Sequence, residues 1–378
     1  MSEETKKAPV IRFKGFFDDW EQRKLKDLAL FNPKSILPEE FEYVDLESVS
    51  GTTMVSHRTE TNGNAPSRAQ RLAIKGDVFY QTVRPYQKNN YLFDLPYDNY
   101  VFSTGYAQLR PYGDSYFLLS RLQEERFVLN VLDRSTGTSY PAINSNDLAQ
   151  IEINVPSQTE EQSKIGAFFK QLDNTIALHL CKQRKLNQLK QSLMREILPQ
   201  SDSFSPHLRL ANFRDPWEKH QLKEVLKVNS GRDYKHLDKG NIPVYGTGGY
   251  MLSVDGKLSD IDGIGLGRKG TIDKPQYLKA PFWTVDTLFY LTPFPNYDIY
   301  FLYTLIQSIN WKSMDESTGV PSLSKSVIER VTLTFPVLEE QQKIGSVFKQ
   351  LDDTIILHQK KVAHLKTLKC TLLNKMFI

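Results

Sequence analysis

The chain has 378 residues, of which 40% are hydrophobic and 11% aromatic, with a formal net charge of +4 and a pI near 8.7. This length allows two or three domains, and this composition excludes a wholly disordered protein. The mild positive charge favours a polyanionic partner without establishing one.

The sequence shows no sign of secretion or of a membrane span. The first residues, MSEETKKAPVIRF, contain no apolar signal-peptide core, and no run approaches the ~18 apolar residues that cross a bilayer. Cys181 and Cys370 lie far apart and outside any CxxC motif, so neither a disulfide framework nor a zinc site is expected. We therefore expect a soluble, cytoplasmic protein.

The first half begins with FFDDWEQRKLKDL at residues 16–28 and continues into a mixed body. A short helix is expected over 117–132, followed by an STG tripeptide at 135–137, then Pro141 and Pro156. Apolar runs bounded by glycine and Asn/Asp turns predict strands. The runs in this half are 41–49, 75–83 and 98–111.

The second half follows the same order. FRDPWEKHQLKEV at 213–225 matches the earlier Trp-Glu segment, a short helix is expected over 300–311, and STG at 317–319 precedes Pro321 and Pro336. The bodies between these landmarks, roughly 30–130 and 228–312, show little similarity that can be aligned by eye. The strands predicted in the second body are 242–254, 262–272 and 282–293.

One segment is nearly duplicated: EEQSKIGAFFKQLDNTIALH at 160–179 and EEQQKIGSVFKQLDDTIILH at 339–358 share 15 of 20 residues. In each copy, apolar residues alternate at spacings of four and three, which is the coiled-coil pattern. The prolines before each copy, and Pro199 after the first, give two helices of about 40 residues, or about 60 Å at 1.5 Å per residue. The alternative is an ordinary core helix, but the length and the duplication favour two helices that pack on each other.

These patterns predict a mixed α/β fold. Two α/β domains would be separated by two long antiparallel helices, with pseudo-two-fold symmetry. The predicted segments are a first domain at 13–155, a central helix at 156–199, a linker at 200–209, a second domain at 210–335 and a C-terminal helix at 336–378.

The sequence lacks the common catalytic motifs. It has no GxxxxGK[ST] loop, no [DN]PP[YF] tetrapeptide, no HExxH, no GxSxG and no His/Cys/carboxylate cluster at metal spacing. GLGRKG at 265–270 matches GxGxxG, but TIDKPQY follows it and carries no helical period, so a dinucleotide site is not expected. A glycine-rich turn presenting Arg268 and Lys269 is the better interpretation. We expect no catalytic residues, no metal and no cofactor in this chain.

The two bodies carry basic residues beside turns and aromatic residues. Lysine and arginine contact phosphates, and the arginine fork can read guanine in the major groove. For any one of them a solvated surface charge is the simpler explanation, so only the collective pattern indicates DNA binding. The candidate DNA contacts are Arg68, Arg71, Arg84, Lys88, Arg232, Lys235, Arg268, Lys269 and Lys274. Two divergent modules on a constant helical frame suit a bipartite target on double-stranded DNA, with parts spaced by the helical repeat.

With these features in order, the chain resembles the specificity subunit of type I restriction-modification systems over essentially its whole length. The resemblance rests on the two Trp-Glu openings, the STG loops, the paired EEQxKIGxxFKQLDxTI helices and three further stretches. Those stretches are PSRAQRLAIKGDVFYQTVRP at 66–85, FSTGYAQLRP at 102–111, and GRKGTI through FWTVDTLFYL at 267–291.

The resemblance implies two target recognition domains that each contact one part of a split, asymmetric DNA site. It implies two modification subunits that bind S-adenosylmethionine and methylate adenine N6, docked on the helical regions. Restriction subunits, which are ATP- and Mg-dependent translocases with a nuclease, would join that core. No membrane partner is implied, and the specificity subunit itself would have no active site.

The helix residues expected to pair the helices and to dock partners form one seam in each copy. They are Ile165, Phe169, Leu172, Ile176, His179, Ile344, Phe348, Leu351, Ile355 and His358. In an antiparallel pair, His179 and His358 would lie close together near the pseudo-dyad. We hypothesise that they help to fix the helix register, as buried polar residues do in coiled coils. Histidines at the edge of the seam, facing solvent, are the alternative.

Three other functions remain open at this point. The first is a protein-binding scaffold built on the same coiled coil. The second is a nuclease with an unrecognised site. The third is the recognition subunit of a related system whose partner fuses methylase and nuclease in one chain.

Overall fold

The computed structural model describes residues 8–199, 206–315 and 317–378. The chain divides into two units: unit 1 is Met1–His179 with Lys360–Ile378, and unit 2 is Leu180–Gln359. Each unit therefore holds one α/β body together with parts of both long helices. Most of the linker predicted at 200–209, and the first seven residues of the chain, lie outside the described residues.

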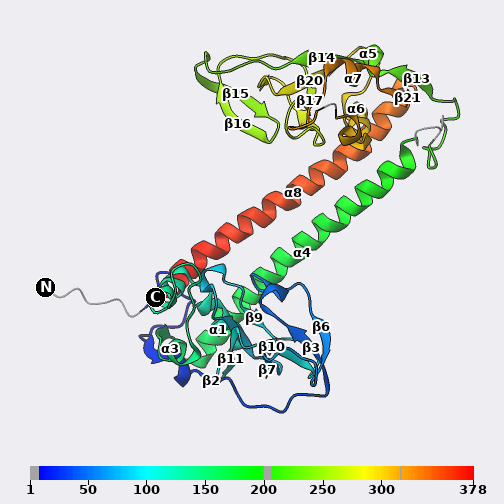
Figure 1. Cartoon of the computed structure of the whole chain (residues 1–378). Coiled ribbons are helices and arrows are strands. Elements are labelled where there is room, and N and C mark those ends of the chain that lie inside the picture. The colour runs from blue at the N-terminus through cyan, green and yellow to red at the C-terminus, as the bar shows by residue number, and fades with distance from the viewer. Residues whose placement is uncertain (1–7, 200–205, 316) are drawn as a thin grey trace. The chain divides into compact units, whose positions relative to one another are not determined.

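Unit 1 contains two four-stranded sheets and two two-stranded ribbons (Figure 1). The first sheet is antiparallel, whereas the second contains one parallel pair, β3 with β10. The first sheet is ordered β2 (Ala29–Phe31), β11 (Tyr106–Pro111), β8 (Val78–Gln81), β9 (Tyr91–Leu92). The second is β6 (Arg58–Thr61), β3 (Glu40–Val44), β10 (Tyr100–Ser103), β7 (Ala69–Leu72). The ribbons are β1 (Glu21–Lys24) with β12 (Glu152–Val155), and the small hairpin β4 (Val49–Ser50) with β5 (Thr53–Met54).

Unit 2 repeats this topology. Its first sheet is also antiparallel, and its second again contains one parallel pair, β15 with β19. The first sheet is ordered β14 (Leu226–Ser230), β20 (Leu288–Pro293), β17 (Gly263–Gly267), β18 (Gln276–Leu278). The second is β16 (Gly249–Val254), β15 (Lys239–Gly246), β19 (Trp283–Thr284), and the ribbon is β13 (Glu218–Gln221) with β21 (Thr332–Phe335). The two bodies thus share a framework that their sequences do not reveal.

Short helices cover the sheets in both units. The single helix predicted over 117–132 is wrong, because the chain breaks at Gln123 and Glu124 into two helices. In unit 1 the helices are α1 (Ser115–Leu122), α2 (Glu125–Asp133) and α3 (Ser145–Ala149), with 3-10 turns η1 (Leu25–Asp27), η2 (Leu46–Ser48) and η3 (Pro85–Gln87). In unit 2 they are α5 (Leu222–Val225), α6 (Ile299–Ser308) and α7 (Lys325–Arg330), with η4 (Trp311–Met314).

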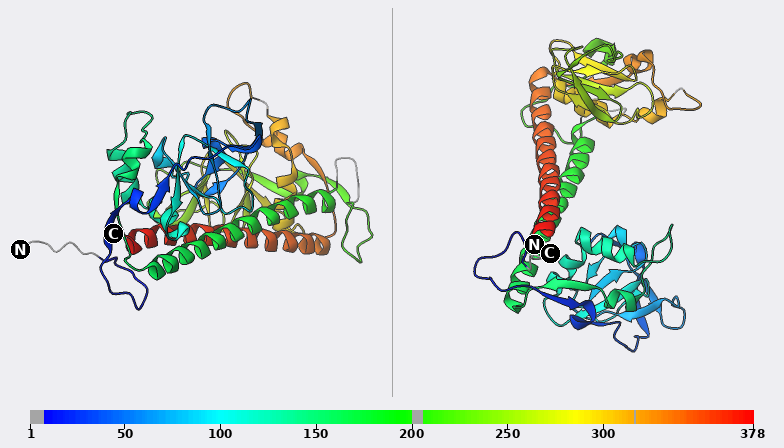
Figure 2. Two further views of the ribbon diagram at one scale, coloured as in Figure 1. Left: turned by 90° about the horizontal axis from the view of Figure 1, so that it is seen from below. Right: turned by 90° about the vertical axis from the view of Figure 1, so that its left-hand side faces the viewer.

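Two 39-residue helices, α4 (Thr159–Ile197) and α8 (Leu338–Met376), confirm the predicted long helices. Both begin shortly after a proline, and α4 ends before Pro199. They run side by side in opposite directions (Figures 1 and 2). Ion pairs inside each unit fix this direction: Asp173 contacts Lys369 in unit 1, and Lys190 contacts Asp352 in unit 2.

The repeated glycine of the KIG motif has a packing reason in each unit. Asp114 caps α1 by accepting from the Phe117 N–H at 2.7 Å, and Asp298 caps α6 in the same way. A Cβ on Gly166 would lie 2.0 Å from the Asp114 carboxylate, and one on Gly345 would lie 2.3 Å from that of Asp298. Only glycine lets each long helix approach the capped end of the short helix so closely.

Each unit has its own core, closed by a tryptophan of the Trp-Glu segment. Trp20 is buried edge-on against Phe117, and Trp217 is buried edge-on against Phe301. Phe377, just past the end of α8, also packs on Trp20 inside unit 1. The end of the chain therefore belongs to the first body rather than to the second.

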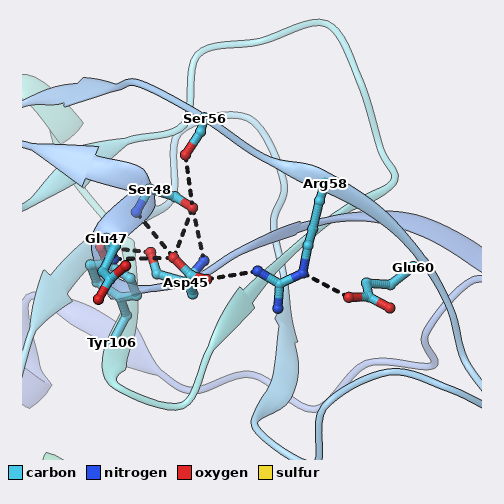
Figure 3. A network of polar contacts seen from close by, with 7 residues as sticks. All are labelled: Asp45, Glu47, Ser48, Ser56, Arg58, Glu60 and Tyr106. Atoms are coloured by element: carbon cyan, nitrogen blue, oxygen red, sulfur yellow. Dashed lines mark hydrogen bonds and ion pairs between the residues drawn. The ribbon is translucent and has the colours of Figure 1, made fainter.

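In unit 1 a polar network fixes the chain just after β3 (Figure 3). The Asp45 side chain accepts from the backbone N–H groups of Glu47 and Ser48, which forms a capping box. Arg58 on β6 bridges Asp45 at 2.8 Å and Glu60 at 2.7 Å. These contacts hold the neighbouring edge strand β6 in place. The strand predicted over 41–49 is correspondingly interrupted by η2.

Candidate nucleic-acid interface

In unit 1 the candidate site is the corner where β8 ends. The backbone of Arg84 is left-handed there, with φ of 55°, and its N–H donates to the Pro141 carbonyl at 2.7 Å. The Arg84 guanidinium lies over the Tyr140 ring, 4.4 Å from its centroid, and that ring is 63% exposed. The stacking holds a planar cation at the surface, beside the STG loop.

The STG loop is tied to the same corner. Thr136 and Ala142 exchange two backbone hydrogen bonds of 2.9 Å each, and Val83 forms a bridge with Ala142. Arg68 joins from another loop, because its carbonyl accepts from Thr104 at 2.8 Å in the turn before β11. Arg68 is exposed and Arg84 is half-buried, and their contact with DNA stays a prediction.

Unit 2 builds the equivalent corner with the same backbone bonds. In unit 1, Thr82 donates to Gly105 at 2.9 Å and accepts from Ile143 at 3.0 Å. In unit 2, Arg268 donates to Thr287 at 2.9 Å and accepts from Leu323 at 2.9 Å. Thr82 and Arg268 thus occupy matching positions at the ends of β8 and β17.

The next two positions also match. Gly270 donates to Pro321 at 2.8 Å, as Arg84 donates to Pro141, and both residues have positive φ. Arg268 and Lys269 are exposed immediately after β17, which is a buried strand. The glycines of GLGRKG before Arg268 thus belong to a strand, and the turn begins only after them, which corrects the expected glycine-rich turn.

The remaining predicted contacts fall into two groups. Arg232, Lys235 and Lys274 are exposed. The backbone N–H of Arg232 donates to the Thr284 carbonyl at 2.8 Å, three residues before Thr287, whose carbonyl accepts from Arg268. Arg71 and Lys88 are less accessible to a DNA ligand. Arg71 is half-buried on β7, where burial lowers its pKa, and the Lys88 ammonium pairs with Glu125.

The long helices carry matching polar clusters inside each unit. In unit 1, Lys369 contacts both oxygens of Asp173 at 2.6 and 2.7 Å, and Tyr116 donates to the same carboxylate at 2.7 Å. Burial, with the Asp173 charge adding to it, raises the pKa of Tyr116. We call this set the unit 1 triad.

The unit 2 triad is Lys190, Asp352 and Tyr300. Lys190 contacts the two Asp352 oxygens at 2.7 and 2.9 Å, and Tyr300 donates to one of them at 3.1 Å. Burial and the Asp352 charge raise the pKa of Tyr300. The ion-paired side chains in both triads are 13–17% exposed. Lys190 and Lys369 continue the four-three spacing of the predicted seam towards the end of each helix. The pattern missed their aspartate partners, which directly follow the seam residues Leu172 and Leu351.

A second matching pair joins the start of each half to a long helix. Arg12 binds Glu161 through two hydrogen bonds of 2.7 and 2.8 Å, and Arg209 binds Glu340 at 2.9 and 2.8 Å. The glutamate side chains are 1% and 0% exposed, and hydrogen bonding to them raises the pKa of both arginines. We call these pairs the clasps. Their signal in the sequence was the arginine shortly before each Trp-Glu segment and the EEQ start of each repeat.

The predicted seam residues lie on α4 and α8, where the apolar ones are buried or half-buried. His179 and His358 are both half-buried. Their proximity stays a prediction, and so does the docking of partners on this seam. Among the described residues no group of three or more His, Cys, Asp or Glu side chains could hold a metal ion. In the same ranges no helix is both long and apolar enough to cross a membrane.

The comparisons with known proteins agree with this architecture. The family model for the type I restriction modification DNA specificity domain matches residues 17–191 and again 214–367. A protein of Mycoplasma genitalium described as a putative type I specificity subunit is 23% identical over 279 residues, which is 70% of each chain. The HindI specificity subunit of Haemophilus influenzae is 29% identical over 136 residues, which cover 34% of this chain and only 29% of that subunit.

Solved structures show the same fold. The crystal structure of a type I S subunit from M. genitalium matches with a TM-score of 0.75 at 19% identity, covering 98% of this chain and 99% of that one. A chain from a study of complex assembly in the type I restriction-modification system matches with a TM-score of 0.53 at 20% identity, covering 94% and 97%. The protein therefore consists of two mixed α/β domains and a pair of long helices, which confirms the predicted fold class. The chain belongs to the type I restriction-modification DNA specificity family and carries the family's domain twice, which confirms the resemblance.

Proposed function

We propose that the two bodies read the two parts of a split, asymmetric site on double-stranded DNA. One observation carries this proposal: both units present basic side chains at one and the same backbone corner, next to the STG loop. The framework is constant there, whereas the side chains differ, which is the arrangement that two reading heads of different specificity need.

The partners follow from family membership. Two modification subunits would dock on the seam of α4 and α8, bringing S-adenosylmethionine for methylation of adenine N6. Restriction subunits would add ATP- and Mg-dependent translocation and cleavage, and the assembly would act in the cytoplasm. The duplicated triads and clasps support two equivalent docking positions, since they build the same local structure around each unit's part of the helix pair.

The proposed base and phosphate contacts are the exposed or stacked arginines and lysines at the corners. A variant carrying Arg68→Ala, Arg84→Ala, Arg268→Ala and Lys269→Ala, assembled with its modification subunits, tests them together. We expect weaker DNA binding and slower methylation, with each base-reading arginine contributing about 1–3 kcal/mol.

The control for that variant replaces four basic residues elsewhere on the bodies, for example Lys26, Lys34, Lys223 and Lys257, all in described segments. Binding and methylation that match the unmodified complex would remove the assignment to the corners. Loss of both activities in the control alone would place the DNA contacts on another face.

A further inference from the structure

An open pocket of about 490 Å³ lies in unit 2, between the end of β17 and the start of α7. Its lining contains three cationic side chains and three serines, and no acidic side chain. These residues are Arg268, Lys269, Lys325, Ser230, Ser322 and Ser324. Lys325 was missed by the sequence analysis, because it stands alone after the loop and not in a basic cluster.

The charge in this pocket is only partly neutralised. Across the described ranges Arg268 and Lys269 form no ion pair, and Lys325 reaches Glu329 only at 3.5 Å. Arg268 lies over the Phe289 ring, 5.8 Å from its centroid, which orients the guanidinium without cancelling its charge. The pocket therefore offers a concentrated positive field to a ligand.

The backbone around the pocket is held in place. The Asp315 carboxylate accepts from the Ser322 N–H at 2.9 Å and from Ser317 in the STG loop. These hydrogen bonds lower the pKa of Asp315, and the one from the Ser322 N–H has the largest effect. Lys269 and Ser322 are also bridged directly. The cations thus project from an ordered surface, so little conformational entropy is lost when a ligand binds.

The matching corner of unit 1 lacks these three cations, and its own cation, Arg84, stands where unit 2 has Gly270. Thr82 and Val83 stand where unit 2 has Arg268 and Lys269, and Ser145 begins α3 where Lys325 begins α7. Asn144 caps α3 as Ser324 caps α7. The framework is the same, and three neutral residues in unit 1 replace three cations in unit 2.

We propose that this pocket binds a phosphate group of the DNA backbone. Unit 2 then makes a sequence-independent contact with DNA at this place, and unit 1 makes no such contact at its matching pocket position. The inference rests on the proposed function and adds to it, because it assigns Arg268 and Lys269 to phosphate contact rather than to base reading and adds Lys325. Lysine and arginine charges with serine hydroxyls match phosphate oxygens, and phosphate contacts position a protein on DNA without reading bases.

The test uses the complete complex of this chain with its modification subunits and a duplex carrying its methylated site. The variant replaces Arg268, Lys269 and Lys325 with glutamine, and the affinity is measured over a series of salt concentrations. Each lost phosphate contact should reduce the slope of log K against log salt by about 0.9. We expect a smaller slope, equal losses on cognate and unrelated DNA, and an unchanged methylation motif.

A matched control replaces Lys223, Lys257 and Lys279, which are exposed in unit 2 outside this pocket, with glutamine. An equal fall of slope in the control would overturn the proposal, because the effect would then come from net charge alone. An unchanged slope with a methylation motif degenerate at one base pair would also overturn it, in favour of base reading. If the unmodified complex shows no salt-dependent DNA binding, the proposed function itself fails, and that result is distinct from both others.

Discussion

The two units repeat each other in the contacts that hold them and differ in the side chains that they expose. The clasps and the triads recur with the same residue types and nearly the same distances. At the corners the backbone hydrogen bonds also recur, but the side chains differ. Unit 1 has Thr82, Val83 and Arg84 at the positions where unit 2 has Arg268, Lys269 and Gly270.

This difference shows where the sequence is constrained. Buried ion pairs and close helix approaches tolerate few replacements, so both copies keep them. A strand end fixed by main-chain hydrogen bonds accepts almost any side chain, so its residues can vary with the DNA that they meet. Specificity can then change without a change of fold.

The largest effect is expected from breaking a clasp. Arg209→Ala would leave the fully buried Glu340 carboxylate without its cation, and breaking such a pair costs about 3–5 kcal/mol. Arg12→Ala should cost unit 1 a similar amount, because Glu161 is 1% exposed. Urea unfolding, followed in both variants, measures the free energy of unfolding.

Two controls sharpen the clasp comparison. Lys343→Ala removes an exposed ion pair with Glu339 and should change the free energy by less than about 1 kcal/mol. Arg209→Met combined with Glu340→Gln should recover part of the loss, because no buried charge is then left unpaired. A full loss in only one of the two clasps would show that the units are not equivalent.

The triads should give the next largest effect. Lys190→Ala and Lys369→Ala each leave a half-buried aspartate with only a tyrosine hydroxyl, at a cost of about 1–3 kcal/mol. The two losses should agree within about 1 kcal/mol, even though Lys190 also donates to Gln307. Thermal or urea unfolding checks this, with the exposed Lys349→Ala as the control. An effect no larger than that of the control would reduce the triads to surface pairs.

Substitutions at the two corners should change the free energy of unfolding by less, and in opposite directions in the two units. Arg84→Gly relieves a left-handed backbone and should leave the free energy of unfolding unchanged or raise it by up to about 1 kcal/mol, while DNA binding falls. Gly270→Ala, at the matching position, should lower the free energy of unfolding by about 1 kcal/mol. Parallel unfolding and DNA-binding measurements separate the two quantities. A destabilised Arg84→Gly protein would mean that the stack on Tyr140 supports the fold.

The smallest effect concerns alkaline pH. Burial raises the pKa of Tyr303 to about 12, and unit 1 has Leu119 at the matching position of α1. Because the folded pKa lies above the unfolded value of about 10, this contribution to stability is complete below pH 10 and is lost as the pH rises through about 12. Tyr303→Phe should flatten the fall of stability with pH, measured as the urea midpoint between pH 9 and 11. Leu119→Met, which adds no titratable group, should leave it unchanged.

The duplicated segment made the long helices predictable, because a heptad pattern and flanking prolines are local signals. The same pattern proposed His179 and His358 as the register device, yet the ion pairs that join the helices involve Asp173 and Asp352. Those aspartates occupy positions beside the seam, and only the approach of the second helix shows that they have partners.

The paired plan of the two bodies could be predicted from their common landmarks, but their residue-by-residue correspondence could not. This correspondence is carried by main-chain bonds such as that from Thr82 to Gly105 and that from Arg268 to Thr287, which impose no residue type. Lys325 was missed for a related reason: its place in the basic pocket depends on a loop that returns to β17 after more than fifty residues. Solvent-exposed basic residues could be named from the sequence, but not grouped into corners.

The most direct test of the central claim is to co-express the chain with its modification subunits and to map methylated adenines across a genome. Two recognition units predict a split motif of two unlike parts with a fixed spacer, and exchanging residues 82–84 for the equivalents in unit 2 should change one part only. A continuous motif, or no methylated motif at all, would contradict the account.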